Sequence, residues 1–233
     1  MSEASIATVV TIDGPAGSGK SSVAQRLAKR LGWQVLDTGA MYRATALLAL
    51  RTGIDPADGD RVAEAARRAE IGFDWSGDPP RILLEGEPVD EAIRTPETTA
   101  AASKVAGSPA VRAILVEAQR RIAAGHPQLI SEGRDQGSVV FPDAVVRFFL
   151  DAPVEERAHR RALQLASSGL PVDVPAIQEA IRTRDELDRT RRVGPLVKPR
   201  DAVVVDTASR SLEEVVDLLE SVVRSQLAVC RSG

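Results

Sequence analysis

The chain has 233 residues, 43% hydrophobic and 27% charged, a composition typical of a folded globular protein with a sizeable core. Its formal net charge of -3 provides no overall positive field for holding nucleic acid or anionic lipid, so neither is expected as a partner. One cysteine excludes an intrachain disulfide framework and a cysteine-based metal cage. With no basic leader and no apolar run long enough to span a bilayer, we expect a cytoplasmic protein without a membrane partner.

The first predicted strand is Thr8–Asp13, a short β-branched and apolar run that suits a strand buried on both faces of a parallel sheet. A glycine-rich turn follows, and apolar residues then recur with helical spacing over residues 21–31. The same order repeats with a strand at 33–36 and a helix at 38–50. This alternation predicts a doubly wound α/β fold.

Three further strand patterns occur later, each followed by a helical or arginine-rich stretch. They cover residues 128–131, 145–150 and 202–205. Together the five strands predict a five-stranded parallel sheet with helices on both faces. No internal repeat and no long linker interrupts the pattern, so we expect a single domain over residues 1–233.

Two appendages to this core are predicted. At approximately residues 60–95, the runs IGFDW and RILLEG flank the turn sequence SGDPP, which indicates a small inserted antiparallel subdomain. Residues 157–195 contain two helical stretches interrupted by SSGLPVDVP and are rich in arginine. This second appendage indicates a short, mobile, arginine-rich lid.

The segment GPAGSGKS fits the phosphate-binding pattern G-x-x-x-x-G-K-[ST] completely and lies between a predicted strand and a predicted helix. In that setting backbone N–H groups face phosphate oxygens, Lys20 neutralises charge on the β- and γ-phosphates, and the Ser21 hydroxyl coordinates Mg²⁺ directly. The sequence therefore predicts a three-layer P-loop NTPase fold that uses ATP with Mg²⁺. The predicted ATP-binding residues here are Gly14, Pro15, Ala16, Gly17, Ser18, Gly19, Lys20, Ser21 and Ser22.

The phosphate-binding segment alone does not choose among P-loop proteins. The chain lacks the N-K-x-D element with which GTPases read guanine, and it is shorter than most helicase or AAA-type ATPases, so a small kinase is expected. Two alternatives stay open on these residues. One is a shikimate-type or broad-specificity nucleoside monophosphate kinase, and the other is a regulatory module that binds nucleotide and signals through lid closure.

Two charged turns follow predicted strands at the carboxyl edge of the sheet, where open α/β sheets bind ligands. The first turn leads to Thr38 and Arg43. The second, EGRD, places Glu132, Arg134 and Asp135 together. We expect Glu132 to hold a Mg²⁺-bound water, Arg134 to bind a phosphate, and Asp135 to accept a hydrogen bond from a base amino group. A solvated, ion-rich turn is the competing interpretation.

The region from residue 157 to residue 200 carries nine arginines and one lysine against five acidic side chains. Arg184 and Arg191 are expected to stabilise charge on a transferring phosphoryl group. The alternative is an exposed salt-bridged helix, with pairs such as Asp185–Arg189 four residues apart. Arginines without a general base suit an acceptor phosphate, because that group is already ionised at neutral pH.

Several stretches spread over nearly the whole chain carry a family resemblance. In order they include TIDGPAGSGKSS, LDTGAMYR, EGRDQGSVVFPDA, ERAHRR and RTRDELDRTR. Together they are similar to the bacterial cytidylate kinases, within the nucleoside monophosphate kinases. The resemblance implies Mg²⁺-dependent transfer of the ATP γ-phosphoryl group to CMP or dCMP, giving ADP and CDP or dCDP in pyrimidine metabolism. It also implies that the inserted sheet covers the monophosphate site.

The resemblance further assigns roles to single residues. Cytosine would be read by Ser103, Arg112 and Asp135, with Thr38 nearby. The sugar would be held by Arg184 and Asp188, the acceptor phosphate by Arg43, Arg134 and Arg191, and the ATP adenine would be flanked by Arg160. The catalytic candidates are Lys20, Arg134, Arg184 and Arg191. Because no exposed apolar stripe stands out in the sequence, we expect a monomer.

Overall fold

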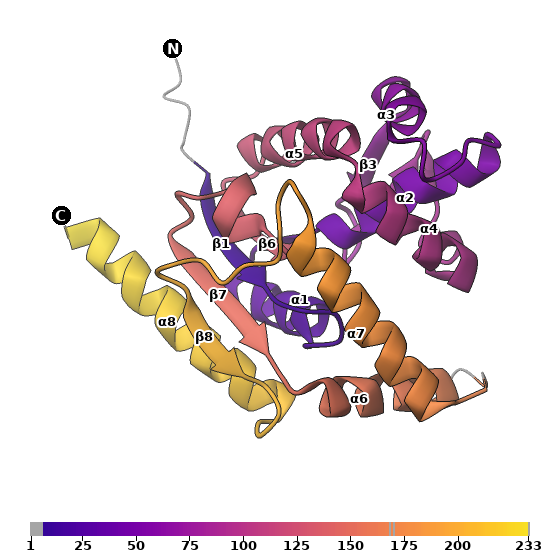
Figure 1. Cartoon of the computed structure of the whole chain (residues 1–233). Helices are drawn as coiled ribbons and strands as arrows, with labels where there is room; N and C mark the ends of the chain where they lie inside the picture. Colours follow the sequence, from indigo (N-terminus) through magenta and orange to yellow (C-terminus); the bar gives the residue numbers. More distant parts are fainter. Residues whose placement is uncertain (1–6, 168, 170, 233) are drawn as a thin grey trace, which may run out of the picture.

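The computed structural model describes residues 7–167, 169 and 171–232. Its centre is a five-stranded parallel sheet with the strand order β2-β6-β1-β7-β8 (Figure 1). The strands are β1 (Thr8–Asp13), β2 (Gln34–Asp37), β6 (Gln128–Gly133), β7 (Val146–Asp151) and β8 (Val203–Asp206). The five predicted strands are confirmed, with ends that differ by at most two residues. Since the strands are parallel, the loops after them share one edge of the sheet.

Alternation along β1 sends side chains into a core on each face of the sheet. Val10 and Ile12 pack with α1 (Lys20–Leu31) and α8 (Leu212–Ser232). Val9 lies in the opposite core, with residues of α2 (Thr38–Arg51) and α5 (Pro109–Ala124). The buried strands and their two helical layers confirm the predicted three-layer α/β architecture.

A separate antiparallel sheet follows α3 (Gly59–Arg68). It consists of β3 (Ile71–Asp74), β4 (Arg81–Leu84) and β5 (Glu87–Pro88), in that order. Ile82 and Leu84 of β4 are buried in the same core as α2. The predicted inserted hairpin is therefore present, and it packs on the main domain instead of forming a core of its own.

The remaining elements surround the carboxyl edge of the main sheet. They are η1 (Ala92–Arg94), α4 (Pro96–Gly107), the π-helical turn η2 (Gln136–Val140), α6 (Val154–Ser167) and α7 (Val174–Thr190). The two helices α6 and α7 pack on each other, and α7 also contacts α4. In Figure 1, α7 passes between the main sheet and the group formed by α2 and α4.

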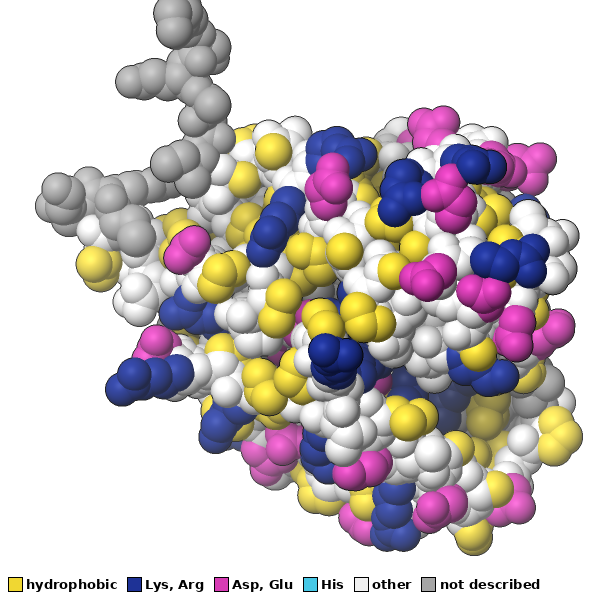
Figure 2. Space-filling view, turned by 45° about the horizontal axis from the view of Figure 1, so that its top comes forward, with side chains coloured by type: hydrophobic (Ala, Val, Ile, Leu, Met, Phe, Trp, Pro, Cys, Tyr) yellow, Lys and Arg dark blue, Asp and Glu magenta, His cyan; other side chains and the backbone are white. Residues whose placement is uncertain are grey.

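The visible surface mixes the two signs of charge. Figure 2 shows Lys and Arg side chains interleaved with Asp and Glu side chains over one face of the molecule. Within the described residues, no helix combines the length and apolar character that a bilayer crossing requires.

Candidate active site

The phosphate-binding loop runs from the end of β1 to the start of α1. Gly14 is required there because a Cβ would overlap the carbonyl of Leu150 in β7. Lys20 is only 4% exposed, and its Nζ donates to the Pro15 carbonyl at 2.8 Å. Burial, reinforced by the nearby Arg134, lowers the pKa of Lys20 to about 7. The negative charge of a bound polyphosphate would favour the protonated, positively charged form of this buried amine.

The predicted ATP-binding residues of the loop differ in their exposure. Ala16, Ser18 and Lys20 are buried, as are Gly14 and Pro15, whereas Gly19 is half-buried and Gly17, Ser21 and Ser22 are exposed. The two exposed serines, Ser21 and Ser22, therefore lie where α1 begins.

Oxygen donors gather where β2 and β6 end. The Ser21 hydroxyl donates to Glu132 Oε1 at 2.6 Å, and Glu132 pairs in register with Asp37 on the neighbouring strand. Burial and then the charge of Asp37 raise the pKa of Glu132. No group of three or more His, Cys, Asp or Glu side chains forms a metal cage in the described residues. This donor set fits Mg²⁺, which is usually held by one or two carboxylates together with substrate phosphates.

Arg43, Arg134, Arg184 and Arg191 form an arginine cluster near Lys20 of the phosphate-binding loop. Arg134 Nε donates to Asp188 Oδ2 at 2.8 Å, and Arg191 also pairs with Asp188. Burial and then the neighbouring Arg134 lower the pKa of Arg184 to about 10. In the described part of the chain, Arg184 Nε and Arg43 Nη1 are buried without a hydrogen-bond partner. The cluster therefore has donors and positive charge available for an anion.

A buried ion pair lies beside this cluster. Arg112 donates to the carboxylate of Asp135, and the two residues are 2% and 3% exposed. The Arg112 guanidinium also lies over the Tyr42 ring, 5.7 Å from its centroid. Burial raises the pKa of Asp135 even though Arg112 opposes that change. Gly194, in the segment after α7, is so close that a Cβ there would overlap both members of the pair.

Three other predicted site residues have different surroundings. The Thr38 hydroxyl donates to the backbone carbonyl of Glu132 at 2.8 Å. Arg160 donates to the Thr207 carbonyl at 2.5 Å and to its hydroxyl at 3.1 Å. Ser103 is half-buried on α4, and no hydrogen bond joins it to the other predicted site residues among the residues described.

Asp13 supports the site but was missed by the sequence analysis. Its carboxylate accepts from the backbone N–H groups of Gln136 at 2.8 Å and Gly137 at 2.7 Å, and so holds the turn that carries Arg134 and Asp135. These partners lie more than a hundred positions away in sequence, so no local pattern marks them.

The interpretation of the arginine-rich helix as an exposed, salt-bridged surface is wrong for Asp185. That carboxylate is 3% exposed and pairs with Arg157 of α6, not with Arg189 one turn along α7. The two helices pack closely enough to offer Asp185 a partner from outside its own helix.

Residues 10–225 match the family model described as Cytidylate kinase. A cytidylate kinase of Mycobacterium avium (strain 104) is 49% identical over 223 residues, covering 96% of this chain and 98% of the relative. Those of Vibrio vulnificus (strain YJ016) and Escherichia coli O1:K1 / APEC are 45% and 44% identical, over 94% and 96% of this chain and 97% and 98% of their own lengths.

Among solved structures, a gluconokinase from Sinorhizobium meliloti 1021 is similar in fold. Its TM-score is 0.51 at 16% identity, with 98% of each chain covered. This likeness concerns the fold alone. The family match, in contrast, runs from β1 into α8, and the similar sequences align over almost their whole lengths. The chain therefore belongs to the cytidylate kinase family.

Proposed function

We propose that this protein transfers the γ-phosphoryl group of ATP to CMP or dCMP, giving ADP and CDP or dCDP. Membership of the cytidylate kinase family supports the reaction. The structural observation that carries the proposal is the arginine cluster between the phosphate-binding loop and the Arg112–Asp135 pair. Its buried, unpartnered donors suit phosphate groups that meet between a nucleotide site and a base site.

The chemistry needs positioning and charge stabilisation more than proton transfer. An oxygen of the acceptor phosphate forms a bond to the γ-phosphorus while the bond from that phosphorus to the β–γ bridging oxygen breaks, and the electron pair leaves with ADP. Lys20, Arg134, Arg184 and Arg191 are the residues proposed to stabilise the charge. Because the acceptor oxygen is already ionised at neutral pH, no general base is required.

Mg²⁺ is the proposed cofactor. Ser21 would bind it directly and Glu132 would bind it through water, and the 2.6 Å contact between their oxygens supports a shared role. When bound, Mg²⁺ neutralises charge on the β- and γ-phosphate oxygens. Asp37, beside Glu132 on the adjacent strand, adds a second carboxylate to the same edge.

Cytosine recognition is assigned to Asp135 and Arg112, with Ser103 and Thr38 at the edge of the site. Cytosine offers an N4 amino donor beside the N3 and O2 acceptors, whereas uracil reverses the first two groups. A carboxylate and a guanidinium held together therefore match cytosine and oppose uracil. Their deep burial supports this assignment, because a mismatched base would leave buried polar groups unpaired.

The remaining roles follow from the same arrangement. Arg43, Arg134 and Arg191 would bind the acceptor phosphate, Arg184 and Asp188 the sugar, and Arg160 would flank the adenine near the loop after β8. We propose that the inserted subdomain (residues 60–95) and the lid (residues 157–195) close over the substrates, and that the protein acts as a cytoplasmic monomer without nucleic-acid partners.

The test is ADP production from Mg-ATP with CMP, dCMP, UMP, AMP, GMP and shikimate as separate acceptors. We expect selective turnover of CMP and dCMP, and its loss in Lys20→Ala. Equal use of UMP or AMP would leave a P-loop kinase but contradict the base-reading roles of Arg112 and Asp135. ATP binding without acceptor-dependent ADP formation would favour a regulatory module and overturn the proposal.

A further inference from the structure

Both helices of the lid, α6 and α7, make hydrogen bonds to one residue of the phosphate-binding loop. The Ala16 backbone N–H donates to Asp185 Oδ1 at 3.3 Å, and the Ala16 carbonyl accepts from Arg157 Nη1 at 2.9 Å. Arg157 Nη1 also lies 2.7 Å from Asp185 Oδ2. The three residues thus form a closed ring of polar contacts. Asp185 accepts from the Ala16 N–H, Arg157 donates to the Ala16 carbonyl, and the two side chains pair with each other.

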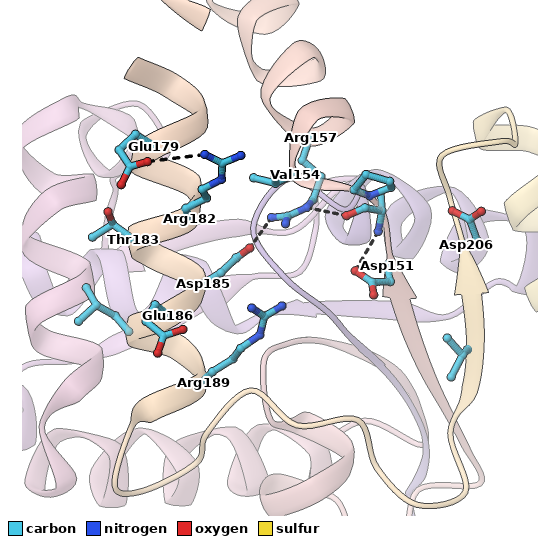
Figure 3. A pocket seen from close by; sticks show the side chains of 14 residues that line it. Asp151, Val154, Arg157, Glu179, Arg182, Thr183, Asp185, Glu186, Arg189 and Asp206 are labelled. Atoms are coloured by element: carbon cyan, nitrogen blue, oxygen red, sulfur yellow. Dashed lines mark hydrogen bonds and ion pairs between the residues drawn. The ribbon is translucent and has the colours of Figure 1, made fainter. Parts of the chain in front are cut away.

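Each member of this ring is fixed from a different element. Arg157, on α6, also donates through Nε to the Ala152 carbonyl at 2.9 Å, and a Cβ placed on Gly17 would lie 3.2 Å from the Arg157 Cβ. Asp185 comes from α7. Figure 3 shows the Arg157 side chain reaching toward Asp185 at the edge of a cavity of about 1070 Å³, which separates α7 from the ends of β7 and β8.

The burial of both side chains determines how this ion pair constrains the loop. Arg157 and Asp185 are 4% and 3% exposed, and a buried ion pair is weak evidence for stability because desolvation offsets much of its attraction. It does, however, penalise any displacement that separates the partners, and here such a displacement would also release Ala16. The ring therefore favours one geometry of the loop.

The charges of the pair have a further consequence. A lone carboxylate beside the phosphate-binding loop would repel a polyphosphate, but Arg157 neutralises Asp185 at the point where it accepts from the loop. The carboxylate can therefore hold the Ala16 N–H without adding net negative charge near the nucleotide. Removing Arg157 leaves that charge unbalanced, so its loss should be the more harmful of the two.

We infer that Arg157 and Asp185 are positioning residues for the ATP phosphates, which fix the phosphate-binding loop at Ala16 and couple it to both lid helices. The inference rests on the ATP-binding role proposed above. Neither residue needs to touch the substrates, because both act through the loop backbone.

The variants Arg157→Met and Asp185→Asn test this inference, with Glu155→Gln as a matched control. Glu155 also joins α6 to α7, through Arg182 at 3.3 Å, but that pair is exposed, and among the described residues no hydrogen bond or ion pair joins it to the loop. We expect the KM for ATP to rise about tenfold in Asp185→Asn and further in Arg157→Met, while the KM for CMP changes less than about threefold. The control should stay within about twofold of the native protein for both substrates.

Two measurements separate positioning from a loss of folding. Hydrogen exchange at the Ala16 amide should accelerate in Asp185→Asn beyond the change in global unfolding measured with urea, because its acceptor is weakened. Arg157→Lys should recover part of the ATP affinity lost in Arg157→Met, because an ammonium restores the charge but not the forked geometry.

Direct titration with ADP distinguishes failure of the inference from failure of the proposed function. If the native protein binds no ADP, the proposed function fails. If it binds ADP and the two variants bind it equally well, or if the KM values for ATP and CMP rise together, the positioning role of Arg157 and Asp185 is wrong.

Discussion

Asp13 and Asp135 are two buried carboxylates near the carboxyl edge of the sheet, and they have different roles. Asp13 accepts from the backbone N–H groups of Gln136 and Gly137, one on each oxygen, and so shapes the turn. Asp135 is carried by that turn and pairs with a side chain, Arg112, which is a partner that a base can share. We therefore expect substitution of Asp13 to change the stability of the fold, and substitution of Asp135 to change the specificity for the acceptor base.

Asp13→Asn should change the pH dependence of stability. Burial, only partly opposed by the two N–H groups, raises the pKa of Asp13 to about 7 from 3.8. Between these values the folded state retains a proton that the unfolded state has lost, so this carboxyl's contribution to stability falls as pH rises. Relative to the variant, the native free energy of unfolding should decrease by on the order of 1 kcal/mol or more from pH 4 to 7. Urea titrations measure this, and parallel curves for the two proteins would contradict it.

Asp135→Ala should weaken discrimination between acceptors. The variant leaves Arg112 without its anionic partner and removes the acceptor proposed for the cytosine amino group, a loss of about 1 to 3 kcal/mol. We expect kcat/KM for CMP to fall at least about tenfold while the ratio of CMP to UMP turnover approaches one. The KM for ATP serves as the internal control, and an unchanged CMP to UMP ratio would refute base reading by Asp135.

The segment that follows α7 forms a wall of the proposed base site. The Leu196 N–H donates to the Asp188 carbonyl at 2.7 Å, which ties the segment back to the end of the helix. Gly194 then lies against the Arg112–Asp135 pair with a φ of 61°. The helix that supplies Arg184 and Asp188 therefore also brings this wall into place, so the lid and the base site are linked through one element.

Gly194→Ala should damage the base site more than the fold. The added Cβ would overlap the Arg112 guanidinium, so we expect the KM for CMP to rise about tenfold or more with little change in ADP binding. Gly53→Ala is the matched control, because Gly53 has a similar φ of 66° but open space around its Cβ. Both variants bear the backbone cost of a left-handed alanine, about 1 kcal/mol. Equal kinetic effects at the two positions would show that backbone strain, and not the overlap, is responsible.

The whole molecule brings its proposed catalytic residues together within one chain. The phosphate-binding loop follows β1, and the Arg112–Asp135 ion pair comes from α5 and the turn after β6. The arginines come from α2, that turn, α7 and the segment after α7. No second copy is needed to complete this set. The face seen in Figure 2 mixes charges of both signs. Exposed apolar residues such as Leu187 and Val204 line the cavity beside α7.

Specific activity should therefore be independent of protein concentration over about a hundredfold range, because mass action does not affect a site formed by one chain. Light scattering after size exclusion should give the mass of a single chain across the same range. Activity that falls on dilution together with the measured mass would contradict the predicted monomer.

The sequence by itself determined the elements whose signals are local. The β-branched run at Thr8–Asp13, the glycine-rich turn and the helical spacing after it are short-range patterns, and they placed β1, the loop and α1 within one residue of the structure. The same holds for the inserted hairpin, because turn residues between two apolar runs report their own conformation. Each family motif is likewise a contiguous run of residues, and the order of these runs along the chain identified the chemistry.

Only the tertiary structure decided which distant groups meet. Asp13 with Gln136, Arg134 with Asp188, and Ala16 with Asp185 join residues separated by 123, 54 and 169 positions. Such pairs depend on strand order and on how α6 and α7 pack, and neither leaves a periodic trace in the sequence. The local spacing therefore predicted Arg189, on the same helix, as the partner of Asp185. The packing of α6 and α7 instead pairs Asp185 with Arg157 and with Ala16 of the phosphate-binding loop.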